Sequence, residues 1–284
     1  MTGIIWLASY PKSGNTWLRA FIANFLHAQN DPVTINELPR FAYGDGVMLH
    51  YETFSGKAAD ELSEDDLVRL RPAVQMWMAR SNAPLDIFVK THNALMIADG
   101  KPLHTPQATA GGIYVVRNPM DVAVSFAHHF QLSFQAAVDA LCTPNYVLPP
   151  GSGMLLQVLG DWSQHYKTWR DAPGLTKHMM RYEDMRADPM RAFGALIQFL
   201  GFPKDKKQLR KAIRFTSFKQ LKKQEDREAF VEARPDGATR FFREGATGGW
   251  RDDLTDAQTR QLIDCHGTVM QELGYLGRDG KLRI

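Results

Sequence analysis

Four basic or titratable side chains stand where short apolar runs of the sequence end. Lys12, Lys90, His92 and Arg117 each close such a run or follow it within a few residues, and short apolar runs are typical of buried strands. The carboxyl ends of parallel strands meet at one edge of a sheet, and ligands bind there. A magnesium-dependent kinase or ATPase carries an aspartate at such a strand end, whereas the two later ends here are basic. The pattern therefore predicts a site for a strongly anionic ligand that requires no metal.

The first of these runs leads into a segment suited to binding phosphate. Residues 9–14 are of loop-forming types, and apolar residues then recur at helical spacing. The first N–H groups of a helix have no internal partner, and the helix dipole adds partial positive charge there. Lys12 would add a full charge, Ser13 and Thr16 would add hydroxyl donors, and Gly14 would let an anion approach the backbone. The alternative is an ordinary strand–helix turn with a surface lysine.

The order of residues in this loop differs from that of the nucleoside triphosphatases. Their pattern, GxxxxGK[ST], places lysine after the last glycine, but Lys12 precedes Gly14 by two positions. We expect the side chain of Asn15 or Thr16 to cap the helix that follows.

Strands and helices are expected to alternate along most of the chain. Further helices should open at Ser63, Pro119 and Pro189, one should run from Met154 to about Asp171, and a last one should span 255–273. This alternation predicts an α/β fold with a mostly parallel sheet and helices on both faces. The strands are expected at 4–8, 86–90, 112–116 and within 178–185.

Residues 27–60 are expected to be irregular, because prolines and glycines interrupt them. Four aromatic side chains in this segment either anchor it to the core or form part of an apolar acceptor pocket. They are Phe41, Tyr43, Tyr51 and Phe54.

Composition narrows the class of protein. The 284 residues, of which 44% are hydrophobic, suffice for one large domain spanning 1–284. The 34 basic and 31 acidic residues leave a net charge of +3, which gives no indication of nucleic-acid binding. Cys142 and Cys265 show neither disulfide nor metal spacing, which is typical of a reducing compartment. No apolar run approaches the roughly 20 residues of a membrane span, so we expect a cytoplasmic protein.

Four strings make the chain similar to the cytosolic-type sulfotransferases, which use 3′-phosphoadenosine-5′-phosphosulfate (PAPS). The resemblance covers about residues 3–275, and it implies a P-loop nucleotide-hydrolase-like three-layer sandwich with a central parallel sheet. It also implies PAPS as the sulfuryl donor. The strings are SYPKSGNTW at 9–17, FVKTH at 88–92, VVRNPMDVAVS at 115–125 and FREGATGGW at 242–250, supported by RYEDM at 181–185 and TSF at 216–218.

The resemblance implies a role for each matching residue. His92 would be the general base for the acceptor hydroxyl, Lys12 would act at the departing phosphate oxygen, and Lys90 would act at the sulfuryl group. The 5′-phosphosulfate would be held by Lys12, Ser13, Gly14, Asn15 and Thr16. The adenine would stack between Trp17 and Phe218, and its polar atoms would be met by Tyr182 and Thr216. The 3′-phosphate would be held by Arg117, Ser125, Arg243 and Gly245.

The sequence departs from the family pattern in three places. The usual RKG of the late loop is REG, with Glu244 in place of a phosphate-binding lysine, and KTHLP becomes KTHNA after His92. The dimer motif KxxxTVxxxE keeps only Thr255, so a homodimer would have to form without that motif. The segment 225–249 is expected to be mobile alone and ordered by PAP, the donor without its sulfuryl group.

Two other functions share part of the pattern. A P-loop kinase would also hold phosphate at such a loop, but the positions of Lys12 and Arg117 disagree with it. A protein that senses PAP would bind the nucleotide without turnover. For a sulfotransferase the acceptor is expected to be a small molecule, apolar or aromatic, with a hydroxyl or an amine.

Overall fold

The computed structural model describes residues 3–28, 30–81, 84–98, 100–151, 153–232, 240–243 and 245–283. The chain forms two compact units, each assembled from segments that are distant in sequence. The first unit contains the chain up to Tyr10, Ala42–Tyr114 and Pro144–Met179. The second contains Pro11–Phe41, Val115–Thr143 and the chain from Met180 onward.

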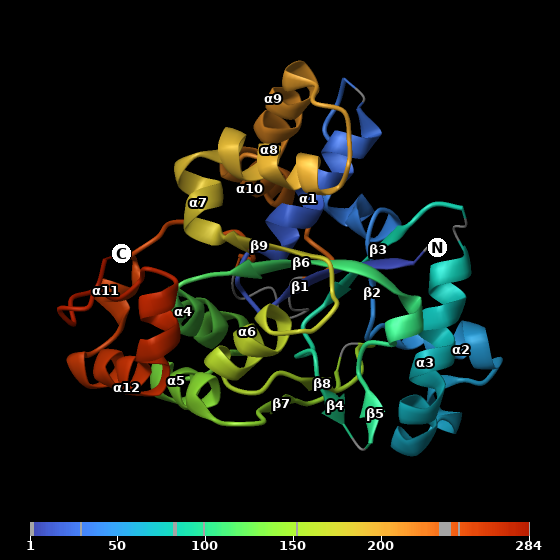
Figure 1. Cartoon of the computed structure of the whole chain (residues 1–284), viewed down its shortest axis with the longest axis horizontal. Helices are drawn as coiled ribbons and strands as arrows, with labels where there is room; N and C mark the ends of the chain where they lie inside the picture. The colour runs from blue at the N-terminus through green and yellow to red at the C-terminus, as the bar shows by residue number, and fades with distance from the viewer. Residues whose placement is uncertain are drawn as a thin grey trace. The chain divides into compact units, whose positions relative to one another are not determined.

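A parallel sheet organises the described chain, with its five strands in the order β2-β3-β1-β6-β9 (Figure 1). Ile4 of β1 pairs with Ile87 of β3 in parallel register, and β2 continues the sheet parallel to β3. The predicted α/β fold with a central parallel sheet is therefore confirmed. The strands are β1 (Ile4–Ser9), β2 (Tyr43–Gly44), β3 (Ile87–Thr91), β6 (Thr109–Val116) and β9 (Lys177–Arg181).

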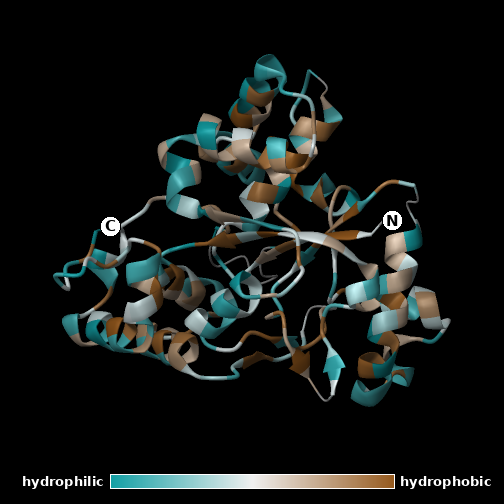
Figure 2. Ribbon diagram, viewed as in Figure 1, coloured by the Kyte–Doolittle hydropathy of each residue, from teal (hydrophilic) through white to brown (hydrophobic). Residues whose placement is uncertain are grey.

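The central strands are mostly buried and rich in apolar residues, and in Figure 2 they are brown in part and pale in part. Strands covered on both faces lose the alternation of polar and apolar residues. Two helices cover this sheet within the first unit. Helix α3 (Glu64–Ser81) contacts β1, and Trp169 of α6 (Trp162–Arg170) lies so close to Gly112 of β6 that a Cβ there would be 3.2 Å from its ring.

Helix α3 begins as the sequence predicts. Asp66 accepts hydrogen bonds from the backbone and hydroxyl of Ser63, and Ser63 Oγ accepts from the Asp66 N–H at 3.2 Å. This reciprocal arrangement satisfies N–H groups that a helix start would otherwise leave exposed. The remaining elements of the first unit are α2 (Met48–Ser55), η2 (Ala59–Glu61), β4 (Ile97–Ala98), β5 (Lys101–Pro102), η3 (Pro106–Ala108), β7 (Val147–Leu148) and β8 (Gln157–Val158).

Two expectations about local structure are wrong. Residues 27–60 are not irregular throughout, because η1 (Ile35–Arg40) and α2 form within them. The helix expected from Met154 starts only at Trp162, where the Asp161 carboxylate accepts from Gln164 N–H at 2.7 Å and caps it. Of the apolar residues before it, Val158 belongs instead to β8, which pairs antiparallel with β7.

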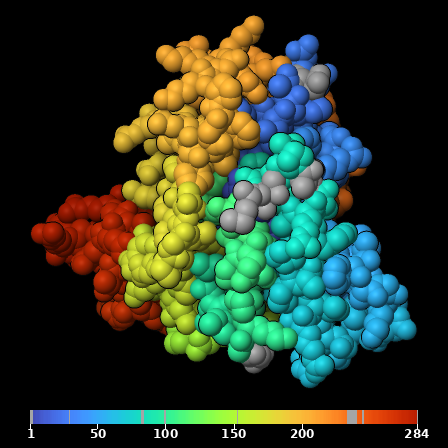
Figure 3. Space-filling model, turned by 45° about the vertical axis from the view of Figure 1, so that its right-hand side comes forward, coloured from blue at the N-terminus to red at the C-terminus, as the bar shows by residue number. Residues whose placement is uncertain are grey.

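The second unit is mainly helical. Its helices open at Pro119 and Pro189 as predicted, and the last one is capped by Thr255. Helix α9 packs against α1, where Gln208 Nε2 donates to Phe25 O at 2.6 Å, and α9 forms part of the orange surface in Figure 3. The helices are α1 (Asn15–His27), α4 (Pro119–Phe130), α5 (Phe134–Cys142), α7 (Tyr182–Ala187), α8 (Pro189–Phe199), α9 (Lys206–Phe215), α10 (Phe218–Arg227), α11 (Trp250–Asp253) and α12 (Asp256–Glu272).

Among the described residues, no helix has both the length and the apolar character needed to cross a membrane. Cys142 and Cys265 are free thiols.

Candidate functional site

The predicted phosphate-binding loop belongs to the second unit and leads into α1. Gly14 occupies the cap position of α1 with φ 107°, and no side chain caps the helix, so the prediction that Asn15 or Thr16 does so is wrong. A Cβ at Gly14 would lie 2.6 Å from the Tyr182 ring. Only glycine suits both this backbone conformation and this close approach. A helix N-terminus without a side-chain cap suits an anion, which can take the place of the cap.

Two hydroxyl groups of this loop are buried. Ser13 is fully buried, and its Oγ has no hydrogen-bond partner within the described residues. Thr16 is 8% exposed, and its Oγ1 accepts a hydrogen bond from Arg19 Nη2 at 3.2 Å. Leaving a buried polar group unsatisfied costs about 1–3 kcal/mol. The Ser13 hydroxyl therefore fits a ligand that supplies the missing partner.

Lys12 adopts a left-handed backbone conformation with φ 68°, which is uncommon for a residue other than glycine. Its Nζ lies 3.9 Å from the centroid of the Phe241 ring. A cation–π contact at a partly exposed site contributes about 0.5–1 kcal/mol, less than a charge-assisted hydrogen bond. A phosphate could therefore displace Phe241 from the ammonium group.

Arg117 connects the phosphate loop with the late segment of the chain. Its Nη1 donates to Lys12 O at 3.3 Å and its Nη2 donates to Ala246 O at 2.9 Å. The guanidinium lies 4.4 Å above the Tyr182 ring, and the Tyr182 hydroxyl donates to Gly245 O at 3.0 Å. Burial raises the pKa of Tyr182, which keeps this hydroxyl protonated and able to donate.

The two residues predicted to stack on adenine, Trp17 and Phe218, pack against one hydrophobic cluster of the second unit. Trp17 makes edge contacts with Tyr182 at 5.6 Å and Phe193 at 5.7 Å between ring centroids. Phe218 packs on Gly245, where a Cβ would overlap its ring and φ is 59°. Close contact with Phe218 thus explains why glycine stands at position 245.

Three other predicted residues have different degrees of burial. Ser125 is half-buried on α4. Thr216 is fully buried and its hydroxyl donates to Ala212 O at 2.9 Å. The hydroxyl oxygen can therefore only accept a hydrogen bond from a ligand. Arg243 is half-buried, and its carbonyl accepts from Lys222 Nζ at 3.4 Å.

The late segment 225–249 is only partly described. Asp121 accepts from Gly248 N–H at 3.0 Å, and Glu225 accepts from the N–H groups of Phe241 and Phe242 at 2.6 and 3.0 Å. Glu244 and residues 233–239 lie outside the described residues. The expected ordering of this segment by PAP therefore stays a prediction, and so does the effect of having Glu244 in place of a phosphate-binding lysine.

His92 lies at the end of β3 in the first unit. Its Nδ1 is 2.8 Å from Ser9 O and 3.3 Å from Ser9 Oγ. A carbonyl oxygen only accepts, so Nδ1 carries the proton. In the neutral ring the lone pair then lies on Nε2, which is the nitrogen that would take a proton from a substrate.

A second histidine holds the backbone of His92. His165 Nε2 is 3.0 Å from His92 O, and His165 Nδ1 is 2.8 Å from the Tyr114 hydroxyl. Nε2 therefore donates to the carbonyl, and Nδ1 accepts from the tyrosine. Complete burial lowers the pKa of His165 to about 4, so the ring is neutral near pH 7 and both hydrogen bonds keep these directions.

The turn after His92 is organised by Asn93, at the point where the sequence departs from the family pattern. Asn93 Nδ2 donates to Asp45 Oδ2 at 2.9 Å, and Asn93 Oδ1 accepts from Val158 N–H at 2.8 Å. Asp45 Oδ2 also accepts from the Thr91 hydroxyl at 2.8 Å. The departure thus places a buried, satisfied polar network where the family has an apolar residue.

The predicted catalytic residues are divided between the two units. Lys90, which is half-buried, and His92 belong to the first unit, and Lys12 belongs to the second with the whole predicted nucleotide set. Arg19, Asn93 and His165 are further residues with defined contacts to these groups. Only Arg19 carried a usable sequence signal, namely its three-residue spacing from Thr16 on a helix. The described chain contains no group of three or more His, Cys, Asp or Glu side chains arranged to hold a metal.

A family model described as the sulfotransferase domain matches residues 3–274. The chain belongs to the sulfotransferase family. The class of enzyme predicted from the four strings, a PAPS-dependent sulfotransferase, is therefore confirmed.

Individual relatives are distant but similar over most of their length. Sulfotransferase 1A1 of Bos taurus is 25% identical over 264 residues, which cover 92% of this chain and 80% of the relative. Cytosolic sulfotransferase 1 of Arabidopsis thaliana is 26% identical over 277 residues, which cover 90% of this chain and 75% of the relative.

Solved sulfotransferase structures share the fold. Mouse sulfotransferase SULT7A1, solved complexed with PAP, has a TM-score of 0.61 at 22% identity, covering 96% of this chain and 86% of its own. Retinol dehydratase, solved with androsterone and PAP, has a TM-score of 0.65 at 20% identity, and the match covers 99% of this chain and 82% of its own. These likenesses confirm the predicted fold class, a P-loop-like fold with a central parallel sheet.

Proposed function

We propose that this sulfotransferase transfers the sulfuryl group of PAPS to a hydroxyl or amine of a small acceptor, with His92 as the general base. The hydrogen bond between His92 Nδ1 and Ser9 O, at 2.8 Å, is the observation that carries the proposal. It leaves the basic lone pair of the neutral ring on Nε2. A neutral imidazole with a free lone pair can act as a general base.

The donor site of this proposal is the loop at the start of α1. Lys12, Ser13, Gly14, Asn15 and Thr16 would hold the 5′-phosphosulfate, and the buried Ser13 hydroxyl and the helix N-terminus fit such an anion. The neighbours solved with PAP support the same nucleotide here. The other donor residues would be Trp17 and Phe218 on the adenine, Tyr182 and Thr216 at its polar atoms, and Arg117, Ser125, Arg243 and Gly245 at the 3′-phosphate.

PAPS, when bound, would supply the sulfuryl group. Each catalytic residue has one task in the proposed transfer. His92 Nε2 accepts the proton of the acceptor as the acceptor oxygen or nitrogen bonds to sulfur. Lys12 stabilises the negative charge left on the departing phosphate oxygen, and Lys90 stabilises the sulfuryl oxygens. Placement and charge stabilisation do most of the catalysis, as in phosphoryl transfer.

The acceptor would be apolar or aromatic. Of the four aromatic residues in 41–54, Phe41 packs on the core cluster of the second unit and Tyr51 is fully buried, so both are anchors. Tyr43 and Phe54 are 38% and 39% exposed. Tyr43 meets His50 edge-on at 5.7 Å, and both line a small hollow of about 140 Å³ with Trp77 and Met78.

Two further predictions belong to the same proposal. Residues 1–284 would work as one sulfotransferase domain, because a single family model matches residues 3–274. The name of the Arabidopsis relative supports a cytoplasmic location.

Calorimetric titration with PAP in the absence of Mg²⁺ tests the donor site. Wild-type chain should bind PAP, and Lys12→Ala and Arg117→Ala should each weaken binding about tenfold or more, since charge-assisted hydrogen bonds contribute about 1.5–3 kcal/mol. Lys57→Ala, which removes an exposed lysine of the first unit, should leave affinity unchanged. Binding of ATP with Mg²⁺ in place of PAP would indicate a kinase. PAP binding without turnover of labelled PAPS in a broad acceptor screen would indicate a sensor.

A further inference from the structure

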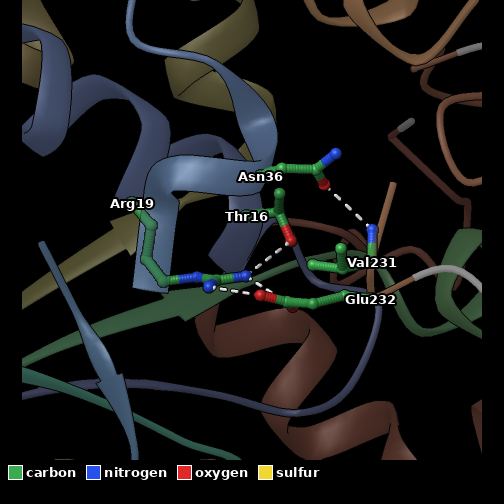
Figure 4. A network of polar contacts seen from close by, with 5 residues as sticks. All are labelled: Thr16, Arg19, Asn36, Val231 and Glu232. Atoms are coloured by element: carbon green, nitrogen blue, oxygen red, sulfur yellow. Dashed lines mark hydrogen bonds and ion pairs between the residues drawn. The ribbon is translucent and has the colours of Figure 1, made fainter. Parts of the chain in front are cut away.

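A partly buried ion pair connects α1 with the segment that follows α10 (Figure 4). Arg19 Nη1 donates to Glu232 Oε1 at 2.6 Å, and Arg19 Nη2 donates to Glu232 Oε2 at 2.7 Å. The Arg19 side chain is 2% exposed and that of Glu232 is 23% exposed. A guanidinium stays protonated in a protein, so its burial requires an anionic partner, and a bidentate pair also fixes its orientation.

The backbone that carries Glu232 is itself held in place. Asn36 Oδ1 accepts from Val231 N–H at 2.9 Å, and Asn36 Nδ2 donates to Ala229 O at 3.0 Å. Asn36 belongs to η1, whose first N–H donates to Gln224 Oε1 of α10 at 3.0 Å. The carboxylate therefore approaches the guanidinium from a fixed position.

The same guanidinium determines which way the Thr16 hydroxyl points. Arg19 Nη2 donates to Thr16 Oγ1 at 3.2 Å. Arginine offers only donors, so the Thr16 oxygen accepts here and its hydrogen must point elsewhere. Threonine hydroxyls within helices usually donate to the carbonyl one turn back. In the part of the chain that the structure describes, however, the Thr16 hydrogen has no acceptor.

We infer that Arg19 is a positioning residue, which fixes the Thr16 hydroxyl as a hydrogen-bond donor to an anion, and that Glu232 holds Arg19 in that orientation. Each Nη atom of Arg19 donates to Glu232, and Nη2 also donates to the Thr16 hydroxyl, so Thr16 is the group of this turn that Arg19 orients. Ser13 is a second, independent sign of an anion at this turn, because its buried hydroxyl lacks a partner among the described residues. The inference rests on the proposed function, in which that anion is the 5′-phosphosulfate.

A double-mutant cycle on PAP affinity, measured by calorimetry with the full chain, tests this inference. Thr16→Val should weaken PAP binding about tenfold, because a hydrogen bond to a charged group is lost. Arg19→Met should weaken it about fivefold, since the hydroxyl then turns to other acceptors. The double variant should bind no more weakly than Thr16→Val alone, because Arg19 acts through that hydroxyl. Losses that multiply to about fiftyfold would overturn the inference.

Three further variants separate positioning from general damage to the fold. Thr16→Ser keeps the hydroxyl, so Arg19→Met should still weaken binding about fivefold in that background. Arg283→Met removes an arginine from an exposed pair with Asp279 and should leave affinity unchanged. If Arg19→Met does not fold, Glu232→Gln replaces it in the cycle. Glu232→Gln should weaken PAP binding about threefold in the wild-type background and should have no effect in the Thr16→Val background. An equal loss of PAP affinity in both backgrounds would overturn the inference.

The outcomes also distinguish this inference from the proposed function. Failure of the wild-type chain to bind PAP would contradict the proposed function. Normal PAP binding by wild type, combined with multiplying losses in the cycle, would overturn only the role of Arg19.

Discussion

The phosphate loop and the His92 turn position their reactive groups by different means. The loop relies on backbone conformation within a few residues, with Lys12 and Gly14 left-handed directly before the N-terminus of α1. His92 depends on contacts that are remote in sequence, since Ser9 is 83 residues away and His165 is 73 residues away. A short motif can specify the first arrangement, whereas the second requires the folded first unit.

This difference separates the expected effects of mutation. Changes in the loop should alter binding of the nucleotide, because in the proposed function the loop groups hold its 5′-phosphosulfate. Changes at His92 should alter the chemical step, because His165 holds the backbone carbonyl of this residue and that contact remains after the ring is removed. The predictions below test this separation.

Removal of the His92 imidazole should have the largest effect. His92→Ala should lower kcat about 10²–10⁴-fold, the usual contribution of a general base, while PAP affinity stays within about twofold. The backbone carbonyl that accepts from His165 is kept, so the turn should remain folded. The measurements are turnover of labelled PAPS and calorimetry with PAP. His27→Ala, at the exposed end of α1, is the control. A comparable loss of PAP affinity in His92→Ala would remove the distinction between the two regions.

Acid should destabilise the chain through His165. Its folded pKa of about 4 lies below the ordinary value of 6.5, so the unfolded chain binds a proton at a pH where the folded chain does not. The free energy of unfolding should therefore be largest above pH 6.5 and should fall by about 3 kcal/mol between pH 6.5 and 4. Urea unfolding across this range measures the slope, which should be shallower in His165→Gln. The same slope in both proteins would show that His165 does not titrate as its burial requires.

Substitution of Gly14 should have the smallest of the three effects, and it should act on binding. Gly14→Ala strains a backbone with φ 107° and places a Cβ 2.6 Å from the Tyr182 ring, so PAP affinity should fall about tenfold. Gly56→Ala is the matched control, because Gly56 also has positive φ, at 71°, but a Cβ there meets nothing within 4 Å. It should cost about 1 kcal/mol of stability and leave PAP binding unchanged. Equal affinities in the two variants would count against a role for the close contact with Tyr182.

The sequence predicted most elements whose signals are local. The strand before Lys12 and the helix after Ser63 could be placed because an apolar run and a reciprocal cap depend on adjacent residues. The helix expected from Met154 failed because an apolar run can also form a short strand. Here β8 pairs with β7, and the residues near 154 do not indicate that pairing.

What the sequence determined by itself is the class of protein, and it also predicted the phosphate loop and the basic strand ends, because residue type and spacing along one segment suffice for them. Only the tertiary structure decided that Ser9 orients the His92 ring, that Asn93 bridges Asp45 and Val158, and that Glu232 holds Arg19 against Thr16. Apart from the bond between Arg19 and Thr16, these are hydrogen bonds between residues distant in the chain. They form only when folding buries both partners together, so no local pattern in the sequence records them.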